Sequence, residues 1–213
     1  AFHHDVAAEH QFAYGDAIVR HGFHADGVAH AQAVLQIRAH TLAGIQGGAG
    51  AANEVSLEHT GHPIVSKLRD CYQAAVAQGL QGQIPLWAGG GIGLSGNAAA
   101  DAFKMICLGA NGVIIGKILI QLLGCVGNEQ GRCNACNTGK CPTGICTQDP
   151  RLVKRLDVDR GAQNIVDYML AFDSELRKLL APVGNSSLPV GRSDALVTTD
   201  KAVADKLDIQ YAC

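Results

Sequence analysis

Four cysteines lie within fourteen residues of one another, in the segment from Cys133 to Cys146. Two residues separate Cys133 from Cys136, four separate Cys136 from Cys141, and four more precede Cys146. The residues between them are mainly Asn, Gly, Pro and Thr, which favour turns and so allow the sulfur atoms to converge. Converging thiolates bind an iron–sulfur cluster or zinc, or they form disulfides.

The local sequence favours an iron–sulfur cluster over the other two possibilities. A Pro directly follows Cys141, as in ferredoxin-type cluster loops. Zinc sites usually combine two Cys pairs, or a Cys pair and a His pair, across a longer spacer, and this segment contains no His. The first residues lack the basic and apolar regions of a secretion signal, so the eight cysteines indicate a reducing, cytoplasmic location.

The composition limits the classes of partner. Of the 213 residues, 47% are hydrophobic and 17% are charged, as in a globular α/β protein, and the net charge is −2. This charge gives no reason to expect nucleic acid or an anionic membrane as a partner. No apolar run approaches the roughly 20 residues that a membrane span requires.

The first part of the chain offers no motif. Residues 1–40 contain seven of the nine histidines in an Ala-rich background, without carboxylates or thiols in a metal-binding frame. We therefore treat residues 1–40 as uninformative.

Two glycine-rich turns follow strand-like apolar runs. The run at 84–88 opens into Gly89–Gly93, and the run at 112–116 precedes Lys117, with a helix expected between them at about 96–108. This order predicts a βαβ unit of a parallel sheet. The turn lacks the G-x-G-x-x-G spacing of a dinucleotide site. It instead fits the last two strands of a (β/α)8 barrel, where backbone N–H groups of both loops hold a phosphate.

A further glycine-rich stretch at 44–50, which includes Gly47 and Gly48, follows an apolar run at 42–45. Such a stretch allows a backbone to approach a ligand closely, although it could equally be a surface loop. A helix is expected from Pro63, at its first helical position, to Gln78, with Gly79 as the stop. The residues that fall at helical spacing along it are Ile64, Leu68, Cys71, Ala75 and Gln78.

The chain beyond the cysteines is expected to be helical. Asp149 and Pro150 should begin a short helix that continues through Arg155, and residues 200–207 should form another. Residues 162–180 predict an amphipathic helix lying on the domain. Its apolar stripe consists of Ile165, Met169, Phe172, Leu176 and Leu179.

The order of these parts resembles the FMN-binding domain of glutamate synthase large subunits, over roughly residues 41–194. The most specific element is the segment Cys141–Pro150, which reads CPTGICTQDP. The other matching elements are GIQGGAGA from Gly44, the glycines from Gly89, LGANGV from Leu108, Gly124-Cys125 and GRSD from Gly191.

This resemblance implies an α/β fold that is the C-terminal part of a (β/α)8 TIM barrel, followed by an iron–sulfur loop and C-terminal helices. The expected boundaries are 41–123 for the last barrel strands and helices, 124–148 for the iron–sulfur loop, and 149–213 for the C-terminal helices and tail. The upstream strands of the barrel have no counterpart, so the chain is expected to be a fragment.

The resemblance also implies an activity, the reduction of 2-iminoglutarate to glutamate. The imine would form from 2-oxoglutarate and from ammonia that an amidotransferase domain or subunit releases from glutamine. Electrons would arrive from a donor subunit or ferredoxin. The alternative is a related FMN and iron–sulfur oxidoreductase, or an electron-transfer module, acting on another amino or keto acid.

The implied cofactors are FMN and a 3Fe-4S or 4Fe-4S cluster. The implied FMN-binding residues are Gly47, Gly48, Gly90, Gly91, Gly116 and Lys117, and no catalytic residue is assigned.

In the bacterial enzymes three cysteines bind the cluster. Cys136 and Cys141 match the second and third of these ligands. The position expected for the first holds Gln130, so Cys133 takes its place, Cys146 is the candidate fourth ligand, and Cys125 is its rival.

Overall fold

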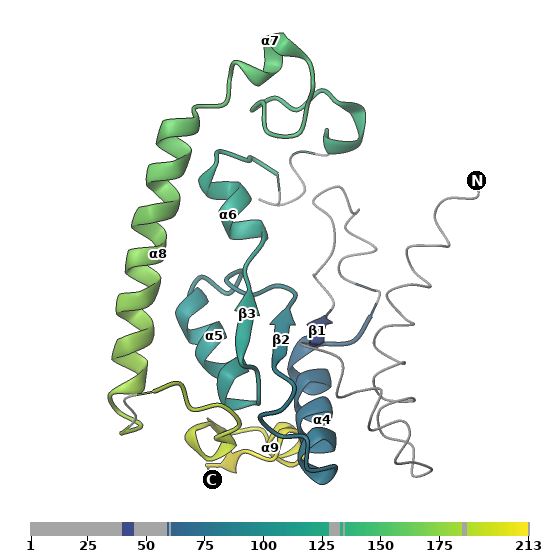
Figure 1. Cartoon of the computed structure of the whole chain (residues 1–213), viewed down its shortest axis with the longest axis vertical. Coiled ribbons are helices and arrows are strands. Elements are labelled where there is room, and N and C mark those ends of the chain that lie inside the picture. The colour runs from purple at the N-terminus through teal and green to yellow at the C-terminus, as the bar shows by residue number, and fades with distance from the viewer. Residues whose placement is uncertain are drawn as a thin grey trace, which may run out of the picture.

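The computed structural model describes residues 40–44, 59, 61–127, 133, 135–184 and 187–212. Three short strands form a parallel sheet in the order β1-β2-β3 (Figure 1). The strands are β1 (His40–Ala43), β2 (Leu86–Gly89) and β3 (Gly112–Ile114). Helix α4 (Ile64–Ala77) connects β1 to β2, and α5 (Ala98–Cys107) connects β2 to β3. The prediction of parallel strands alternating with helices is therefore confirmed, while three strands do not by themselves show a closed barrel.

Helix α4 begins one residue later than expected. Pro63 is its N-cap residue, with extended backbone, and not its first helical residue. The buried positions Ile64, Leu68, Cys71 and Ala75 follow the predicted helical spacing. Gly79 takes φ 66°, a left-handed conformation that suits glycine just beyond a helix end.

Helix α5 is delimited by its polar and glycine neighbours. Asn97 caps it by accepting a hydrogen bond from the N–H of Ala100 at 2.9 Å. Gly109 ends it with φ 121°, and a side chain there would overlap the ring of Tyr72. The chain directly after α5 consequently packs closely on Tyr72 of α4.

The sheet has one buried face and one open face among the described residues. Leu42 pairs with Ala88, and Ala88 pairs with Val113, so these three side chains form one row across the strands. Leu42 and Ala88 are buried in the core beneath α4 and α5, and Val113 packs against that core. On the opposite face, Trp87 is 42% exposed and Ile114 is 44% exposed.

Two further helices run along one side of the molecule. Helix α6 (Lys117–Leu122) follows β3, and none of its residues is buried. Helix α8 (Val158–Leu180) begins four residues before the expected start, because Asp157 caps it through the N–H of Arg160. It packs against α5 and α6 (Figure 1).

The predicted apolar stripe of α8 is only partly covered. Ile165, Phe172, Leu176 and Leu179 are half-buried. Met169 is 42% exposed, so its placement in the stripe is wrong, since the inward position of that turn belongs to Tyr168. None of the described helices combines the length and apolar character that crossing a bilayer requires.

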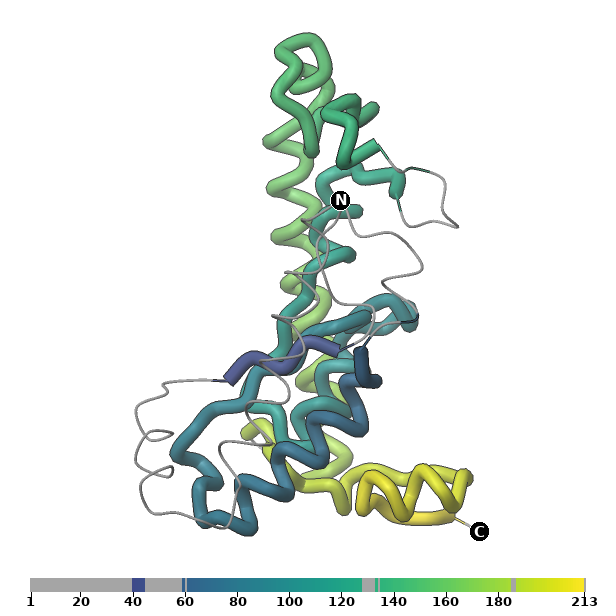
Figure 2. The backbone as a smooth tube through the Cα atoms, turned by 90° about the vertical axis from the view of Figure 1, so that its right-hand side faces the viewer, coloured from purple at the N-terminus to yellow at the C-terminus, as the bar shows by residue number. Residues whose placement is uncertain are grey.

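The last elements lie at the amino-terminal end of the strands, opposite the cysteine segment (Figures 1 and 2). They are η2 (Ser193–Ala195), β4 (Val197–Thr198), α9 (Lys201–Leu207) and β5 (Gln210–Tyr211). The buried guanidinium of Arg69 on α4 donates to Asp208 at 2.6 Å and to the hydroxyl of Ser193 at 2.9 Å. This pair of bonds fastens the C-terminal elements to α4.

Candidate functional site

The cysteine segment lies beyond α6, at the end of the molecule toward which the strands point (Figure 1). It contains the short helix η1 (Cys136–Thr138) and leads into α7 (Pro150–Val153), which Asp149 caps as predicted. Gly144 takes φ 83°, and a Cβ built there would lie 2.5 Å from the carbonyl oxygen of Leu152. Glycine is therefore required where the segment folds back on α7.

The sulfur of Cys141 is surrounded by hydrogen-bond donors. It lies 3.4 Å from the hydroxyl of Thr143, and the backbone N–H groups of Thr143, Ile145 and Cys146 also point to it. Burial by itself would raise the pKa of the Cys141 thiol, but these donors favour the thiolate and lower the pKa to about 7. The segment is thus built to hold one thiolate at this position.

Three other thiols, those of Cys146, Cys125 and Cys133, lie near enough to Cys136 to affect its pKa. Burial raises the pKa of the Cys136 thiol, and its neighbours raise it further. Cys146 acts on it through both a hydrogen bond and its charge, whereas Cys125 and Cys133 act through their charges. Like charges close together disfavour one another, so these four sulfur groups need a bound cation if they are to be thiolates together.

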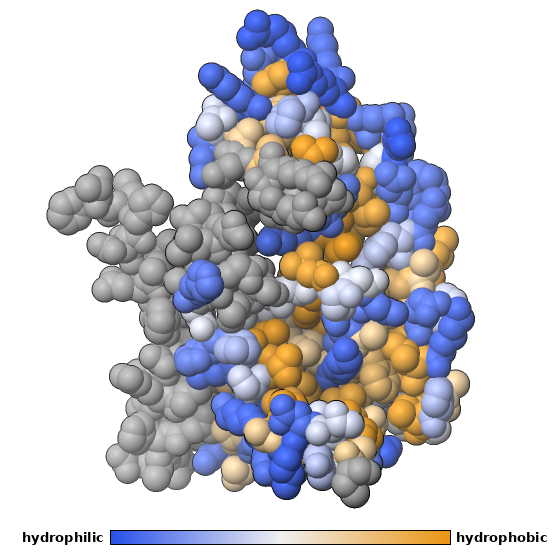
Figure 3. Space-filling model, turned by 180° about the vertical axis from the view of Figure 1, so that it is seen from behind, coloured by the Kyte–Doolittle hydropathy of each residue, from blue (hydrophilic) through white to orange (hydrophobic). Residues whose placement is uncertain are grey.

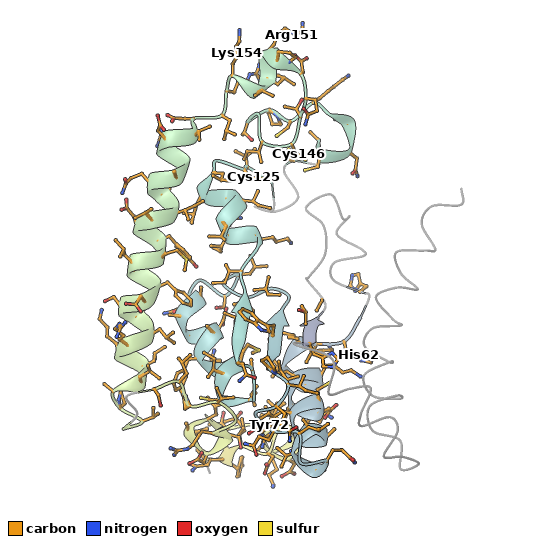
Figure 4. The ribbon with its side chains drawn as sticks, in the orientation of Figure 1. His62, Tyr72, Cys125, Cys146, Arg151 and Lys154 are labelled. Carbon is orange, nitrogen blue, oxygen red and sulfur yellow. The ribbon has the colours of Figure 1, made fainter. Side chains whose placement is uncertain are left out.

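Cys125 approaches this group from the end of α6. The N–H of Gly124 donates to Gln121 at 2.8 Å, the N–H of Cys125 donates to Ile120 at 3.1 Å, and Gly124 has φ 99°. This pattern is a Schellman motif, which fixes the direction of the chain after a helix. A Cβ built on Gly127 would lie 3.5 Å from the sulfur of Cys125 and 3.9 Å from the Cβ of Cys133, so these two cysteines are near each other. Figure 4 labels Cys125 just beyond α6 and Cys146 in the cysteine segment.

The other described cysteines are separate from this group. Cys71 and Cys107 are buried in helices α4 and α5, and none of the cysteines in the described ranges forms a disulfide. Burial, followed by the charge of Asp194, raises the pKa of the Cys107 thiol to about 11. Both thiols therefore act as core residues. Cys213 lies outside the described residues.

Two turns that contain glycine follow β2 and β3, at the end of the sheet that points toward the cysteine segment (Figure 1). Gly90 and Gly91, directly after β2, take φ 116° and 69°. Gly116 lies between β3 and Lys117, and a Cβ built on it would contact nothing within 4 Å. Because β2 and β3 are neighbours in the sheet, the two turns lie side by side. Gly47 and Gly48 lie outside the described residues.

The turn after β2 is held by Asp101 on α5. Its carboxylate accepts hydrogen bonds from the N–H of Gly93 at 2.9 Å and from the hydroxyl of Ser95 at 2.7 Å. Sequence reasoning assigned no role to Asp101. The contact could have been inferred from the position of Asp101, because it is a carboxylate in the first turn of a helix that follows a glycine-rich turn.

The chain matches the conserved region of glutamate synthase over residues 17–186. The chain belongs to the glutamate synthase family. The resemblance seen in the sequence is thereby confirmed, and the match includes part of the segment 1–40 that sequence analysis left uninterpreted.

Individual relatives agree with this assignment. The archaeal glutamate synthase [NADPH] of Methanocaldococcus jannaschii is 39% identical over 145 residues, which are 68% of this chain and 27% of the relative. The glutamate synthase [NADPH] large chain of Bacillus subtilis is 31% identical over 180 residues, which are 84% of this chain and 11% of the relative. The chain therefore spans about a quarter of the archaeal relative.

The cysteine segment of this family member has the donor chemistry of an iron–sulfur site. Thiolates held by N–H···S bonds and clustered thiols are what such a cluster requires. Within the described ranges, no three Cys, His, Asp or Glu side chains already surround one point at metal-binding distance. The cysteines fit an iron–sulfur cluster because they supply thiol ligands and several of them lie near one another.

Proposed function

We propose that the chain is part of an FMN- and iron–sulfur-dependent glutamate synthase, in which its three strands belong to the C-terminal part of a (β/α)8 barrel. The observation that carries the proposal is that the glycine turns and the cysteine group occupy the same end of the sheet (Figure 1). Ligands of parallel α/β folds bind at this carboxyl end of the strands. When bound, FMN would supply a hydride to 2-iminoglutarate, with electrons arriving through the cluster.

The ligands of the cluster are proposed from the thiols that gather in the segment. Cys133, Cys136, Cys141 and Cys146 remain the candidates predicted from the sequence. Cys125 joins them as a full candidate, because the Schellman motif of α6 directs it to the same group. Five thiols are therefore available for the three or four positions of a 3Fe-4S or 4Fe-4S cluster.

The turns after β2 and β3 are proposed to hold the FMN phosphate. Gly90, Gly91 and Gly116 would bring backbone N–H groups to it, and Lys117 would add a positive charge. Because Gly91 has φ 69°, a branched side chain there would strain the turn as well as block the approach. Normal FMN binding by a Gly91→Val variant of the complete protein would contradict this site.

The proposed division of the chain follows these two sites. Residues 41–123 belong to the barrel, 124–148 to the iron–sulfur loop and 149–213 to the C-terminal helices and tail. The glycines at Gly47 and Gly48 are proposed as a further part of the FMN site. The partners proposed are an amidotransferase domain or subunit and an electron donor, either a subunit or ferredoxin.

The proposed reaction is tested by following nitrogen. The complete protein, with FMN and iron loaded, is given reduced methyl viologen, 2-oxoglutarate and glutamine carrying an isotopic nitrogen label on its amide. Glutamate labelled at its amino nitrogen is the expected product. A fully loaded protein that reduces neither 2-oxoglutarate with ammonia nor with glutamine would contradict the reaction and favour an electron-transfer module or another keto acid.

A further inference from the structure

The chain that follows Cys141 is held against α7 by two contacts of its backbone. At Gly144 a Cβ would lie only 2.5 Å from the carbonyl oxygen of Leu152, so the main chain there lies directly against the helix. The guanidinium of Arg155, just beyond α7, donates to the carbonyl oxygen of Pro142 at 3.1 Å. The backbone on both sides of Thr143 is therefore fixed.

The hydroxyl of Thr143 lies 3.4 Å from the sulfur of Cys141, within hydrogen-bond distance for a sulfur atom. Of the four cysteines predicted as ligands from the sequence, Cys141 is buried, whereas Cys133 and Cys136 are half-buried and Cys146 is exposed. Hydrogen bonds are electrostatically stronger where water is excluded. The contact between Thr143 and Cys141 is thus in the part of the segment where a hydrogen bond to sulfur has the largest effect.

The direction of this hydrogen bond depends on the state of the sulfur. While Cys141 is a thiol, either atom can be the donor. A cysteine that binds iron is a thiolate, which has no proton and can only accept, so the hydroxyl of Thr143 must then be the donor. The backbone N–H groups of Thr143, Ile145 and Cys146 also donate to this sulfur. Because those donors are main-chain groups, the hydroxyl is the donor that a substitution can remove.

We propose that Thr143 raises the reduction potential of the iron–sulfur cluster by donating its hydroxyl hydrogen bond to the sulfur of Cys141. The inference rests on the proposed function, which makes Cys141 a ligand of that cluster. Reduction adds one electron from the proposed donor to the cluster and increases the negative charge on its sulfur atoms. A hydrogen bond to a ligand sulfur stabilises this more negative state. Thr143 would thus favour electron entry, whereas sequence analysis assigned it only to a turn.

The test measures the midpoint potential of the cluster in the complete protein, by titration with dithionite followed by electron paramagnetic resonance. Thr143→Val keeps the shape of the side chain and removes its hydroxyl. The equilibrium constant for reduction should fall about tenfold in this variant, which lowers the potential by about 59 mV for one electron. Thr143→Ser keeps the hydroxyl and should retain the wild-type potential. Both variants should contain as much iron as the wild type, because the hydroxyl is not a ligand.

Thr138→Val is the matched control within the same segment, since the hydroxyl of Thr138 donates to the carbonyl oxygen of Ala135 at 2.8 Å. It should leave the potential unchanged. Unchanged potential in Thr143→Val would overturn the inference while leaving the proposed cluster intact. An equal shift in Thr143→Ser or in Thr138→Val, or loss of the cluster from Thr143→Val, would also overturn it, because each would show a purely structural role. A wild-type protein without an iron–sulfur signal in either redox state would instead overturn the proposed function.

Discussion

Individual glycines in this chain are required for two separable reasons, backbone conformation and space. Gly191, in the GRSD segment, has φ 75°, and a Cβ there would overlap the hydroxyl of Tyr72. Its N–H also donates to Ile106 at 3.0 Å, which ties the segment to the end of α5. Gly184 has a similar φ of 68°, but a Cβ there would meet nothing within 4 Å.

A comparison of substitutions at the two glycines separates the cost of steric overlap from the cost of backbone strain. Gly191→Ala should lower the free energy of unfolding of the complete protein by about 2–4 kcal/mol, from strain and overlap together. Gly184→Ala should lower it by about 1 kcal/mol, from strain alone. Urea unfolding of both variants measures the difference, and equal losses would show that Tyr72 yields without cost.

In the cysteine segment, the pKa of Cys136 is raised by burial and then by its neighbours Cys146, Cys125 and Cys133. Cys136→Ser should abolish the iron–sulfur absorbance and the iron content of the purified protein, because it removes a proposed ligand of the cluster. Cys71→Ala is the control: it removes a thiol from the core of α4 and should retain full iron per folded molecule. Iron retained in Cys136→Ser would exclude this residue as a ligand.

Much of this residue chemistry could be predicted from local sequence. The caps Asn97, Asp149 and Asp200 belong to this class, since each accepts hydrogen bonds from N–H groups two or three residues ahead. The sequence did not predict that the enclosed hydroxyl of Tyr168 lies beside the turn at Gly93, because that turn is more than fifty residues away along the chain. Local patterns carry no information on such contacts.

Among the elements, α4 shows how a helix can be held by an ion pair in which only the guanidinium is buried. The side chain of Arg69 is 5% exposed, whereas its partner Asp208 is 70% exposed and takes φ 53°, just after α9. A second pair, Lys206 with Asp70 at 2.7 Å, joins the same two helices at the surface. The buried position of the guanidinium distinguishes the two pairs.

Asp208→Asn should lower the free energy of unfolding by about 1–3 kcal/mol, since it leaves a buried guanidinium without its counter-charge. Asn tolerates the left-handed backbone at this position, so strain does not contribute. Lys206→Ala should change stability by less than about 1 kcal/mol, as expected for an exposed pair. Thermal unfolding compares them, and equal effects would show that water reaches Arg69.

The type of each element could be predicted from the sequence, but the neighbouring elements that cover it could not. The 3.6-residue spacing of Ile64, Leu68 and Cys71 predicted both α4 and its buried face. The same reasoning on α8 placed Met169 inside, although that position is exposed. Periodicity defines a stripe, but the width of the stripe that is covered depends on α5 and α6, which contact it from one side.

The molecule as a whole has an elongated arrangement, with the cysteine segment at one end and the C-terminal elements at the other (Figure 2). Hydrophobic residues reach the surface across its middle (Figure 3). On the sheet, Trp87 lies over Gly112 in the row that faces away from α4 and α5. An open apolar sheet face is what the inner wall of a barrel would present before its remaining strands are added.

The 213 residues by themselves should therefore be poorly ordered. We expect helical far-ultraviolet circular dichroism, strong binding of a hydrophobic dye and no sharp thermal transition, because the core has only one covered face. The complete protein should melt cooperatively. A sharp cooperative transition from the isolated 213 residues would contradict the assignment of the open face to a barrel interior.

The central claim, that this chain places a flavin beside an iron–sulfur cluster, is tested most directly by the visible absorption spectrum of the complete protein purified without oxygen. We expect flavin bands over a broad iron–sulfur absorbance, both of which decrease on chemical reduction. A colourless protein with zinc bound at its cysteines would contradict it.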